Sequence, residues 1–161
     1  DMVLQTDGLT QLVNRLGYEH YLARLRVPAA ILMFDVDRFK DVNDCHGHLM
    51  GDACLRTIAG CIRRAYGNYG TCFRIGGDEF ALIVNGEVDA EWCAQRMETI
   101  KSIIRQTYVL EGQTIDISTS CGVVCYPADS ADVRELRILA DQRMYEDKQK
   151  TGSSRSAVLS V

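Results

Sequence analysis

Apolar side chains recur every three or four residues in four stretches of the chain, and this spacing predicts amphipathic helices. The predicted helices cover residues 10–26, 52–66, 93–104 and 133–150. Pro28 follows the first helix and prevents it from continuing, because proline lacks a backbone amide hydrogen. Gly47 and Gly51 break the polar stretch before the second helix, so no element is predicted there.

Strands are predicted where short apolar runs are bounded by turn residues. They fall at residues 29–34, 71–75, 80–84, 108–110, 115–125 and 157–161. The run at 29–34 has no polar position, which is typical of a central strand buried on both faces. Gly76 and Gly77 separate two strands and predict a hairpin with acidic residues at its tip. The turn at 111–113 predicts a second hairpin.

This order of helices and strands predicts one α+β (α/β) domain over residues 1–161, since no linker-like segment or internal repeat interrupts it. A mostly antiparallel sheet with helices on one face, a ferredoxin-like plan with additions, fits the order best. No secretory signal opens the chain, and from its start at Asp1 we expect it to be a C-terminal fragment of a longer protein.

Composition excludes several classes of function. With 18 basic and 22 acidic side chains the net charge is −4, so a general basic surface for nucleic acid is not expected. The longest apolar stretch, residues 27–34, is far shorter than the roughly 20 residues of a membrane helix. The 7 cysteines are odd in number and form no C-x-x-C pair, which favours buried thiols in the cytosol.

Two acidic clusters are candidates for chemistry. Asp35 and Asp37 stand at the end of the predicted central strand, and Asp78 and Glu79 at the hairpin tip. Adjacent strands lie about 5 Å apart, so Asp35 and Asp78 can converge. Converging carboxylates repel each other unless a cation lies between them, and Mg²⁺ suits such oxygen ligands. Charged strand ends would explain either cluster alone, but the two together favour a metal site.

A calcium loop starting at Asp35 is excluded, because Phe39 and Lys40 occupy the fifth and sixth positions, where the EF-hand pattern requires Asp or Asn and then Gly. No phosphate-binding G-x-x-x-x-G-K-[ST] loop, G-x-G-x-x-G fingerprint or G-x-S-x-G elbow is present in the sequence. Bound phosphates would therefore be held by a metal, by lysines and by loop amides.

The segment 43–52 is rich in hydrogen-bonding groups. The Asn43 amide and the Asp52 carboxylate together can recognise the N1–H and N2 edge of guanine. Two alternatives remain open here. Cys45, His46 and His48 offer ligands for zinc, although they are crowded into four positions, and Asp52 is a candidate helix N-cap.

These motifs resemble the GGDEF domain of bacterial diguanylate cyclases, over residues 7–148. Residues 7–15 resemble the family's opening D-x-L-T-G-L-x-N-R, with Gln11 in place of Gly, and residues 34–52 resemble its D-x-D-x-F-K-x-x-N-D-x-x-G-H-x-x-G-D segment. The signature pentapeptide is intact and consists of Gly76, Gly77, Asp78, Glu79 and Phe80. Residues 140–148 resemble the closing A-D-x-A-L-Y-x-A-K less closely.

The resemblance implies a nucleotidyl-cyclase core related to the palm of polymerases, and it implies residue roles. The implied metal ligands are Asp35, the carbonyl of Val36, Asp78 and Glu79, holding two Mg²⁺ per active site with Mn²⁺ as an alternative ion. The implied substrate-binding residues are Asn43, Asp52 and His48 for guanine, and Arg38, Phe39, Lys40 and Lys148 for the phosphates. Asp78, Glu79 and Lys40 are the implied catalytic residues, with Asp78 positioning or accepting the attacking proton.

The implied reaction joins two GTP molecules, held by two facing protomers, into cyclic di-GMP with release of two pyrophosphates. A sensor or receiver domain is expected N-terminal to this chain. The catalytic domain is expected in the cytoplasm, even where the full-length protein is anchored in a membrane. It is expected to contact neither nucleic acid nor the membrane directly. One alternative is an inactive GTP-binding sensor module. An ATP cyclase is disfavoured, because Asp52 matches guanine rather than adenine.

Three departures from the family pattern modify these expectations. Gly67 and Gly70 replace the usual Arg and Asp of the product-inhibition site, so no feedback inhibition is expected through it. Gly152 stands where a phosphate-contacting Arg is usual, which weakens GTP binding unless Lys150 or Arg155 substitutes for it. Asp147 replaces a small residue beside Lys148, and reduced activity is the expected result.

Overall fold

The computed structural model describes residues 3–151, and the predicted strand at 157–161 lies outside this range. A short 3-10 helix, Val3–Gln5, opens it. The helices are α1 (Arg15–Ala23), α2 (Phe39–His46), α3 (His48–Tyr66), α4 (Ala90–Ile104) and α5 (Val133–Thr151). The strands are β1 (Ala29–Val36), β2 (Thr71–Arg74), β3 (Glu79–Asn85), β4 (Gln106–Leu110), β5 (Gln113–Ile117) and β6 (Thr119–Tyr126).

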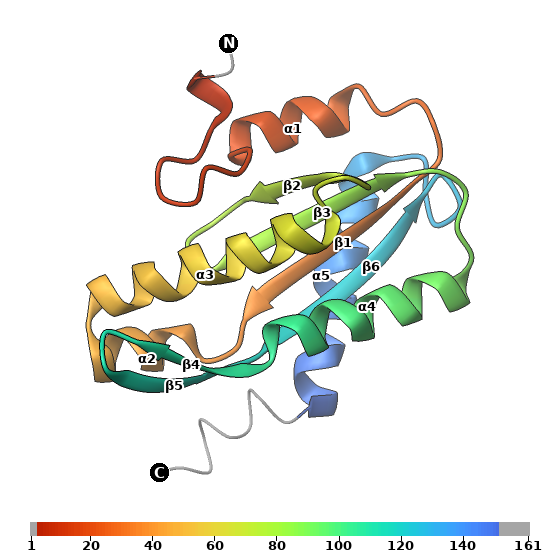
Figure 1. Ribbon diagram of the computed structural model, residues 1–161. Helices are drawn as coiled ribbons and strands as arrows, with labels where there is room; N and C mark the ends of the chain where they lie inside the picture. The colour runs from red at the N-terminus through yellow and green to blue at the C-terminus, as the bar shows by residue number, and fades with distance from the viewer. Residues whose placement is uncertain (1–2, 152–161) are drawn as a thin grey trace.

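Four strands form an antiparallel sheet in the order β2-β3-β1-β6, and β4 and β5 form a separate hairpin. The prediction of a mostly antiparallel α+β fold is therefore confirmed. β1 runs through the sheet between β3 and β6 (Figure 1). At its end, Asp35 is paired with Glu79 of β3 on one side and with Ser120 of β6 on the other.

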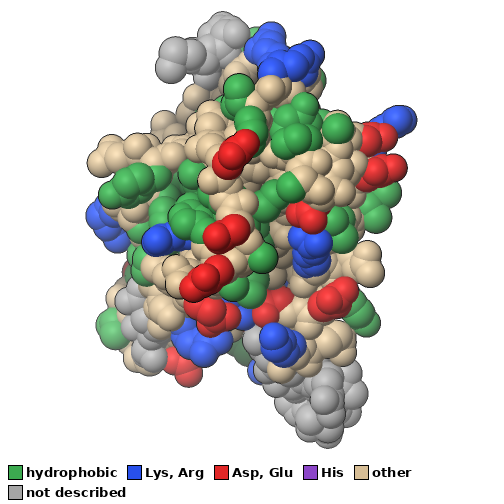
Figure 2. Space-filling model, turned by 90° about the vertical axis from the view of Figure 1, so that its right-hand side faces the viewer, with side chains coloured by type: hydrophobic (Ala, Val, Ile, Leu, Met, Phe, Trp, Pro, Cys, Tyr) green, Lys and Arg blue, Asp and Glu red, His purple; other side chains and the backbone are tan. Residues whose placement is uncertain are grey.

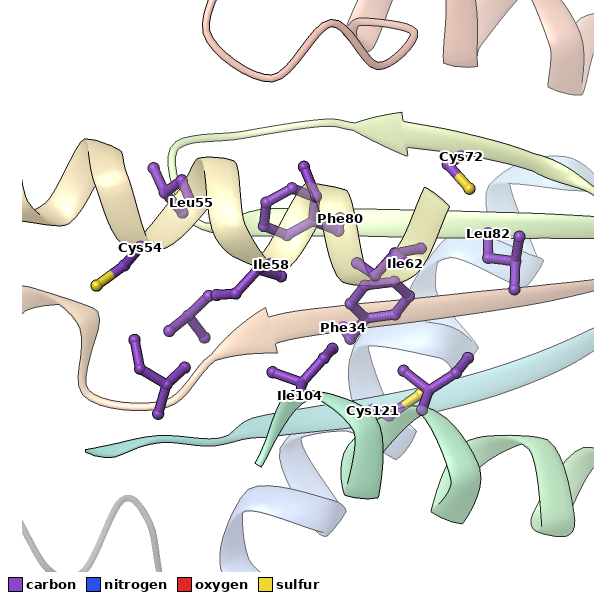
Figure 3. Close-up of a cluster of buried hydrophobic side chains, with 14 of the residues drawn as sticks. Phe34, Cys54, Leu55, Ile58, Ile62, Cys72, Phe80, Leu82, Ile104 and Cys121 are labelled. Carbon is purple, nitrogen blue, oxygen red and sulfur yellow. The ribbon is translucent and has the colours of Figure 1, made fainter. Parts of the chain in front are cut away.

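Helices cover both faces of the sheet, because the side chains of β1 alternate between two hydrophobic clusters. Leu32 and Phe34 pack with residues of α3 and α4, including Ile58 and Ile104 (Figure 3). Ile31 and its alternate neighbours pack with α1 and α5 on the other face. The expectation that helices lie on one face is wrong, whereas the prediction of a central strand buried on both faces is confirmed.

Helix α2 was not predicted, because its sequence is mostly polar and only Val42 is buried. It begins after Arg38, which adopts a left-handed backbone with φ of 55°, and it ends at Gly47, with φ of 88°. Helix α1 begins later than predicted. The Asn14 side chain caps it by accepting a hydrogen bond from the Gly17 amide at 3.0 Å.

The single strand predicted at 115–125 is two strands, β5 and β6, which are separated at Ser118. The cause is Asp37, which follows β1. Its amide donates to the Ser118 carbonyl at 2.9 Å, and its carboxylate accepts hydrogen bonds from the Ser118 and Ser120 hydroxyls at 2.7 and 2.6 Å. Asp37 therefore fastens the end of β1 to β6.

The surface carries charges of both signs. On the side that lies at the right of Figure 1, acidic and basic side chains are interspersed among hydrophobic ones (Figure 2). Within residues 3–151, no helix combines the length and the apolarity that a membrane span requires.

Gly122 of β6 lies directly against the backbone of α5. A methyl group at this position would come within 2.3 Å of the Ala140 carbonyl oxygen and 2.7 Å of the Met144 amide nitrogen. We expect Gly122→Ala to push α5 away and to lower the free energy of unfolding by about 2 kcal/mol. Urea denaturation measures this change, and an unaltered midpoint would contradict the close packing.

Gly60→Ala is the matched control. Gly60 lies inside α3, and an added methyl group would meet only the end of the flexible Arg64 side chain. Because alanine favours the helix, this variant should instead be more stable by about 0.5–1 kcal/mol.

Candidate active site

Asp35 occupies the last part of β1, on the face that is covered by α5. Lys148 of α5 approaches it, with 3.1 Å between the Lys148 Nζ and the Asp35 Oδ2. The other carboxylate oxygen, Oδ1, is buried and has no hydrogen-bond partner. A buried acceptor without a donor is costly, so this oxygen is suited to receive a cation.

Asp78 lies beside Asp35 because the tip of the β2–β3 hairpin is bonded to the end of β1. The Val36 amide donates to the Asp78 carbonyl at 3.1 Å. Burial, followed by the proximity and the charge of the Asp78 carboxyl group, raises the pKa of Asp35 to about 6, although Lys148 opposes this shift. The two carboxylates therefore converge as predicted from the strand geometry.

Arg74 braces the glycine turn that carries Asp78. It donates from Nη2 to the Gly77 carbonyl at 2.8 Å and from Nε to the Gly76 carbonyl at 3.2 Å. Its Nη1 lies 3.2 Å from both carboxylate oxygens of Asp7, which also accepts two hydrogen bonds from Thr10. Sequence reasoning missed this brace. The signal for it is an arginine two positions before a turn that has no side chains of its own.

Two further carboxylates gather at the same corner. Glu79 is the cross-strand partner of Asp35, and burial, then the charges of Asp141 and Asp35, raise its pKa. Burial also raises the pKa of Asp141, and Asp35 adds to the shift although Arg137 opposes it. Asp141 was not singled out from the sequence. The excess of negative charge at this corner favours the binding of a cation.

A metal ion at this corner would need further ligands besides the carboxylate side chains. Among residues 3–151, no group of three or more His, Cys, Asp or Glu side chains is arranged to hold an ion. Asp35 Oδ1 and Asp78 fit a hard cation that takes its other ligands from backbone carbonyls, water and phosphate, as Mg²⁺ does. The zinc alternative requires Cys45, His46 and His48. Cys45 and His48 are exposed, and the His46 ring is hydrogen-bonded to the Gln113 side chain.

The predicted guanine-binding residues lie on two packed helices, α2 and α3. Gly51 makes room for Asn43, since a methyl group on Gly51 would lie 1.9 Å from the Asn43 Oδ1. This oxygen is buried and has no hydrogen-bond partner, which suits a ligand donor. Asp52 follows on α3 and is half-buried, whereas His48 at the start of the helix is exposed.

Two of the predicted phosphate-binding residues, Arg38 just before α2 and Lys40 within it, pair with acidic side chains of that helix. The Arg38 Nε lies 2.8 Å from Asp41, and the Lys40 Nζ lies 3.2 Å from Asp44, with the Lys40 side chain 90% exposed. Phe39 is partly buried against the core. Of the predicted cations, only Lys148 contacts the acidic corner, while Gly152 and Arg155 lie outside the described residues.

The model of the family described as "Diguanylate cyclase, GGDEF domain" matches residues 4–154. The chain is a GGDEF domain. It is 36% identical over 149 residues to the bifunctional diguanylate cyclase/cyclic di-GMP phosphodiesterase MucR of Pseudomonas aeruginosa, an alignment that covers 88% of this chain and 22% of the relative. It is 37% identical over 126 residues to the diguanylate cyclase DgcZ of Escherichia coli, covering 78% and 42%.

Solved GGDEF domains share the fold. The GGDEF domain of TpbB (YfiN) from Pseudomonas aeruginosa superposes with a TM-score of 0.82 at 32% identity, covering 90% of this chain and 89% of the other. The GGDEF domain of DgcB from Caulobacter crescentus, solved in complex with c-di-GMP, gives a TM-score of 0.81 at 28% identity, covering 92% and 89%. This GGDEF domain spans less than half of the length of the two curated relatives described above.

Asp35→Asn should stabilise the metal-free GGDEF domain at pH 7.5. The pKa of Asp35 is about 6 in the fold against 3.8 for an ordinary Asp, so between these values the folded state binds more protons than the unfolded state. The wild-type free energy of unfolding therefore falls as pH rises from about 4 through 6, and the Asp35→Asn variant does not show this fall. Thermal unfolding in EDTA from about pH 4 to pH 7.5 measures the difference, which should vanish near pH 4.

Asp129→Asn serves as the control with the opposite sign. Burial acts to raise the pKa of Asp129, but hydrogen bonds from Arg143 and the Cys125 amide lower it overall. Its contribution to stability is thus present at neutral pH and is lost as pH falls. Equal pH profiles for the wild type and Asp35→Asn would contradict the raised pKa of Asp35.

Proposed function

We propose that this GGDEF domain condenses two GTP molecules into cyclic di-GMP with release of two pyrophosphates, as a homodimer of half-sites. The observation that carries the proposal is the Asp35 carboxylate, whose Oδ1 is buried and unpartnered beside Asp78. A site of this kind attracts a hard cation with bound phosphates. The domain would draw on cytoplasmic GTP, so we also propose a cytoplasmic location.

The residue roles follow from this arrangement. Asp35, Asp78 and the Val36 carbonyl, supported by Glu79, would hold Mg²⁺, or Mn²⁺ as an alternative. Bound at two positions, the metal would neutralise charge on the triphosphate and lower the pKa of the attacking hydroxyl.

The remaining residues bind and orient the nucleotide. Asn43 and Asp52 would recognise the guanine edge, since the Asn43 Oδ1 is buried without a donor and Asp52 is half-buried on the adjoining helix. Lys148 would contact the phosphates. Lys40, whose side chain is exposed and pairs with Asp44 of the same helix, would turn toward the leaving pyrophosphate.

Catalysis needs two protomers because each would hold one nucleotide. The 3′-hydroxyl of one GTP attacks the α-phosphorus of the other, and a pyrophosphate leaves. Asp78 would position the attacking hydroxyl or accept its proton. Holding both nucleotides face to face contributes up to about 7–11 kcal/mol to lowering the barrier. The rate should therefore rise with protein concentration until the dimer is saturated.

The first test incubates the purified chain at high concentration with GTP and Mg²⁺ and resolves the nucleotides by chromatography. Cyclic di-GMP and two equivalents of pyrophosphate are expected from the wild type. Asp78→Ala should abolish both products, whereas Glu87→Ala, which removes an exposed carboxylate beyond the far end of β3, should leave the rate unchanged. Matched thermal unfolding curves exclude misfolding.

The same assay distinguishes the cyclase from the alternative function, a GTP-binding sensor module. A GTP-binding sensor module would be stabilised by GTP against thermal unfolding but would release no pyrophosphate, even as a forced dimer. That outcome would refute the cyclase proposal. Competition with ATP tests the substrate, and equal stabilisation by ATP and GTP would contradict the roles of Asn43 and Asp52.

We also propose that the product does not inhibit this domain through the segment after α3. Gly67 and Gly70 replace the charged pair of the family's inhibitory motif, and at both positions an added side chain would meet a backbone carbonyl. A methyl group would come within 2.6 Å of the Arg63 carbonyl oxygen at Gly67, and within 2.5 Å of the Ile83 carbonyl oxygen at Gly70. At saturating GTP, initial rates should be unchanged by added cyclic di-GMP, and a saturable fall in rate that excess GTP does not relieve would contradict this prediction.

A further inference from the structure

A buried ion pair joins α4 to α5 next to the candidate active site. The Lys101 Nζ lies 2.9 Å from both carboxylate oxygens of Asp147, and the two side chains are only 6% and 7% exposed. The same carboxylate accepts a hydrogen bond from the Cys121 amide of β6 at 2.8 Å. One side chain of α5 is thus fastened to a helix and to a strand at once.

Stability alone does not account for this pair. Removing two charges from water carries a large desolvation cost, and apolar side chains of similar volume often join helices at least as well. What an ion pair of this kind supplies is a defined geometry, because the carboxylate must face both the ammonium group and the β6 amide.

The pair controls the part of α5 that reaches the site. Asp147 is followed by Lys148, and consecutive helical residues point about 100° apart, so one faces α4 and β6 while the other faces Asp35. The Cys121 amide that holds Asp147 belongs to the residue next to Ser120, the cross-strand partner of Asp35. The amide that holds Asp147 and the carboxylate that Lys148 contacts therefore lie in adjacent cross-strand pairs of the sheet.

Asp147 is also the last buried side chain of α5 among those described. Beyond it, Lys148 is half-buried and the next two residues are exposed. A helical segment with few buried contacts opens readily. Without the anchor, Lys148 would belong to such a weakly held segment.

We propose that Asp147, together with Lys101, is a positioning residue for the nucleotide site, holding the last turn of α5 so that Lys148 faces Asp35 and the substrate phosphates. The inference rests on the proposed function, since Lys148 is taken to contact GTP. It differs from the sequence-based expectation that Asp147 beside Lys148 reduces activity. Asp147 is directed away from Asp35 and supports its neighbour.

The matched control is the pair formed by Asp129 and Arg143. It has the same design, because Arg143 of α5 lies 3.2 Å from the Asp129 carboxylate, which accepts a hydrogen bond from the Cys125 amide of β6 at 2.7 Å. Cys125 pairs with Ala30, near the start of β1 and remote from Asp35. Asp129→Asn should therefore affect stability without affecting nucleotide binding.

The test is a double-mutant cycle on GTP turnover, with Asp147→Asn, Lys148→Met and their combination. Asp147→Asn should raise the KM for GTP by roughly fivefold or more with little change in kcat, because Lys148 binds the ground-state phosphates. In the Lys148→Met background, the same substitution should change KM by less than about twofold. Additive effects, or a wild-type KM in Asp147→Asn, would overturn the proposal.

A second variant guards against misfolding. Asp147→Asn leaves Lys101 buried without its partner, so Lys101→Met with Asp147→Ala removes both charges while keeping an apolar contact. This variant should unfold near the wild-type temperature yet show the raised KM. If it is stable and has the KM of the wild type, Asp147 has only a structural role.

Binding of a non-reactive GTP analogue with Mg²⁺, measured by calorimetry, separates this inference from the proposed function. If the wild type binds the analogue but forms no cyclic di-GMP, the cyclase proposal fails, and the same cycle measured on Kd still tests Asp147. If the wild type binds no analogue, both proposals fail.

Discussion

The convergence of two carboxylates at the end of β1 is the constraint on which the rest of the site depends. Asp35 and Asp78 repel each other, and the fold opposes this repulsion through its backbone. β1 is paired on both sides, and the Val36 amide is bonded to the Asp78 carbonyl. Because the atoms that hold the tip are main-chain atoms of a buried strand, the two backbone segments stay close together, and the negative charge of the two carboxylates favours a cation.

The glycine turn that carries Asp78 must also be held in place. Gly76 and Gly77 give a ligand close access to the backbone, but they offer no side chain that could hold the turn in place. Arg74 holds it by donating hydrogen bonds to the Gly76 and Gly77 carbonyl groups, and the Asp7 carboxylate in turn accepts a hydrogen bond from the guanidinium. Thr10 donates to Asp7, so the opening segment of the domain is part of the structure that sets the position of Asp78.

The sequence predicted local features well and distant contacts poorly. β1, the β2–β3 hairpin and the helical spacing depend on neighbouring residues, and the meeting of Asp35 with Asp78 follows from strand geometry. The bond between Arg74 and Asp7 joins residues 67 positions apart, and the pair of Lys101 with Asp147 joins residues 46 apart. No periodicity encodes such contacts. Helix α2 was missed because it is short and mostly polar, with Val42 as its one buried side chain, and the break at Ser118 because Asp37 imposes it from the segment after β1.

The two oxygens of Asp35 have different neighbours, and this asymmetry links the anchored end of α5 to the metal site. Lys148 lies at Oδ2, while Oδ1 is buried and unpartnered. An ammonium group held on one oxygen partly neutralises the carboxylate without occupying the other. If Lys148 moved freely, it could cover either oxygen and compete with a cation for Asp35. In the proposed role, Asp147 keeps Lys148 at Oδ2, so that the buried Oδ1 stays available to a cation.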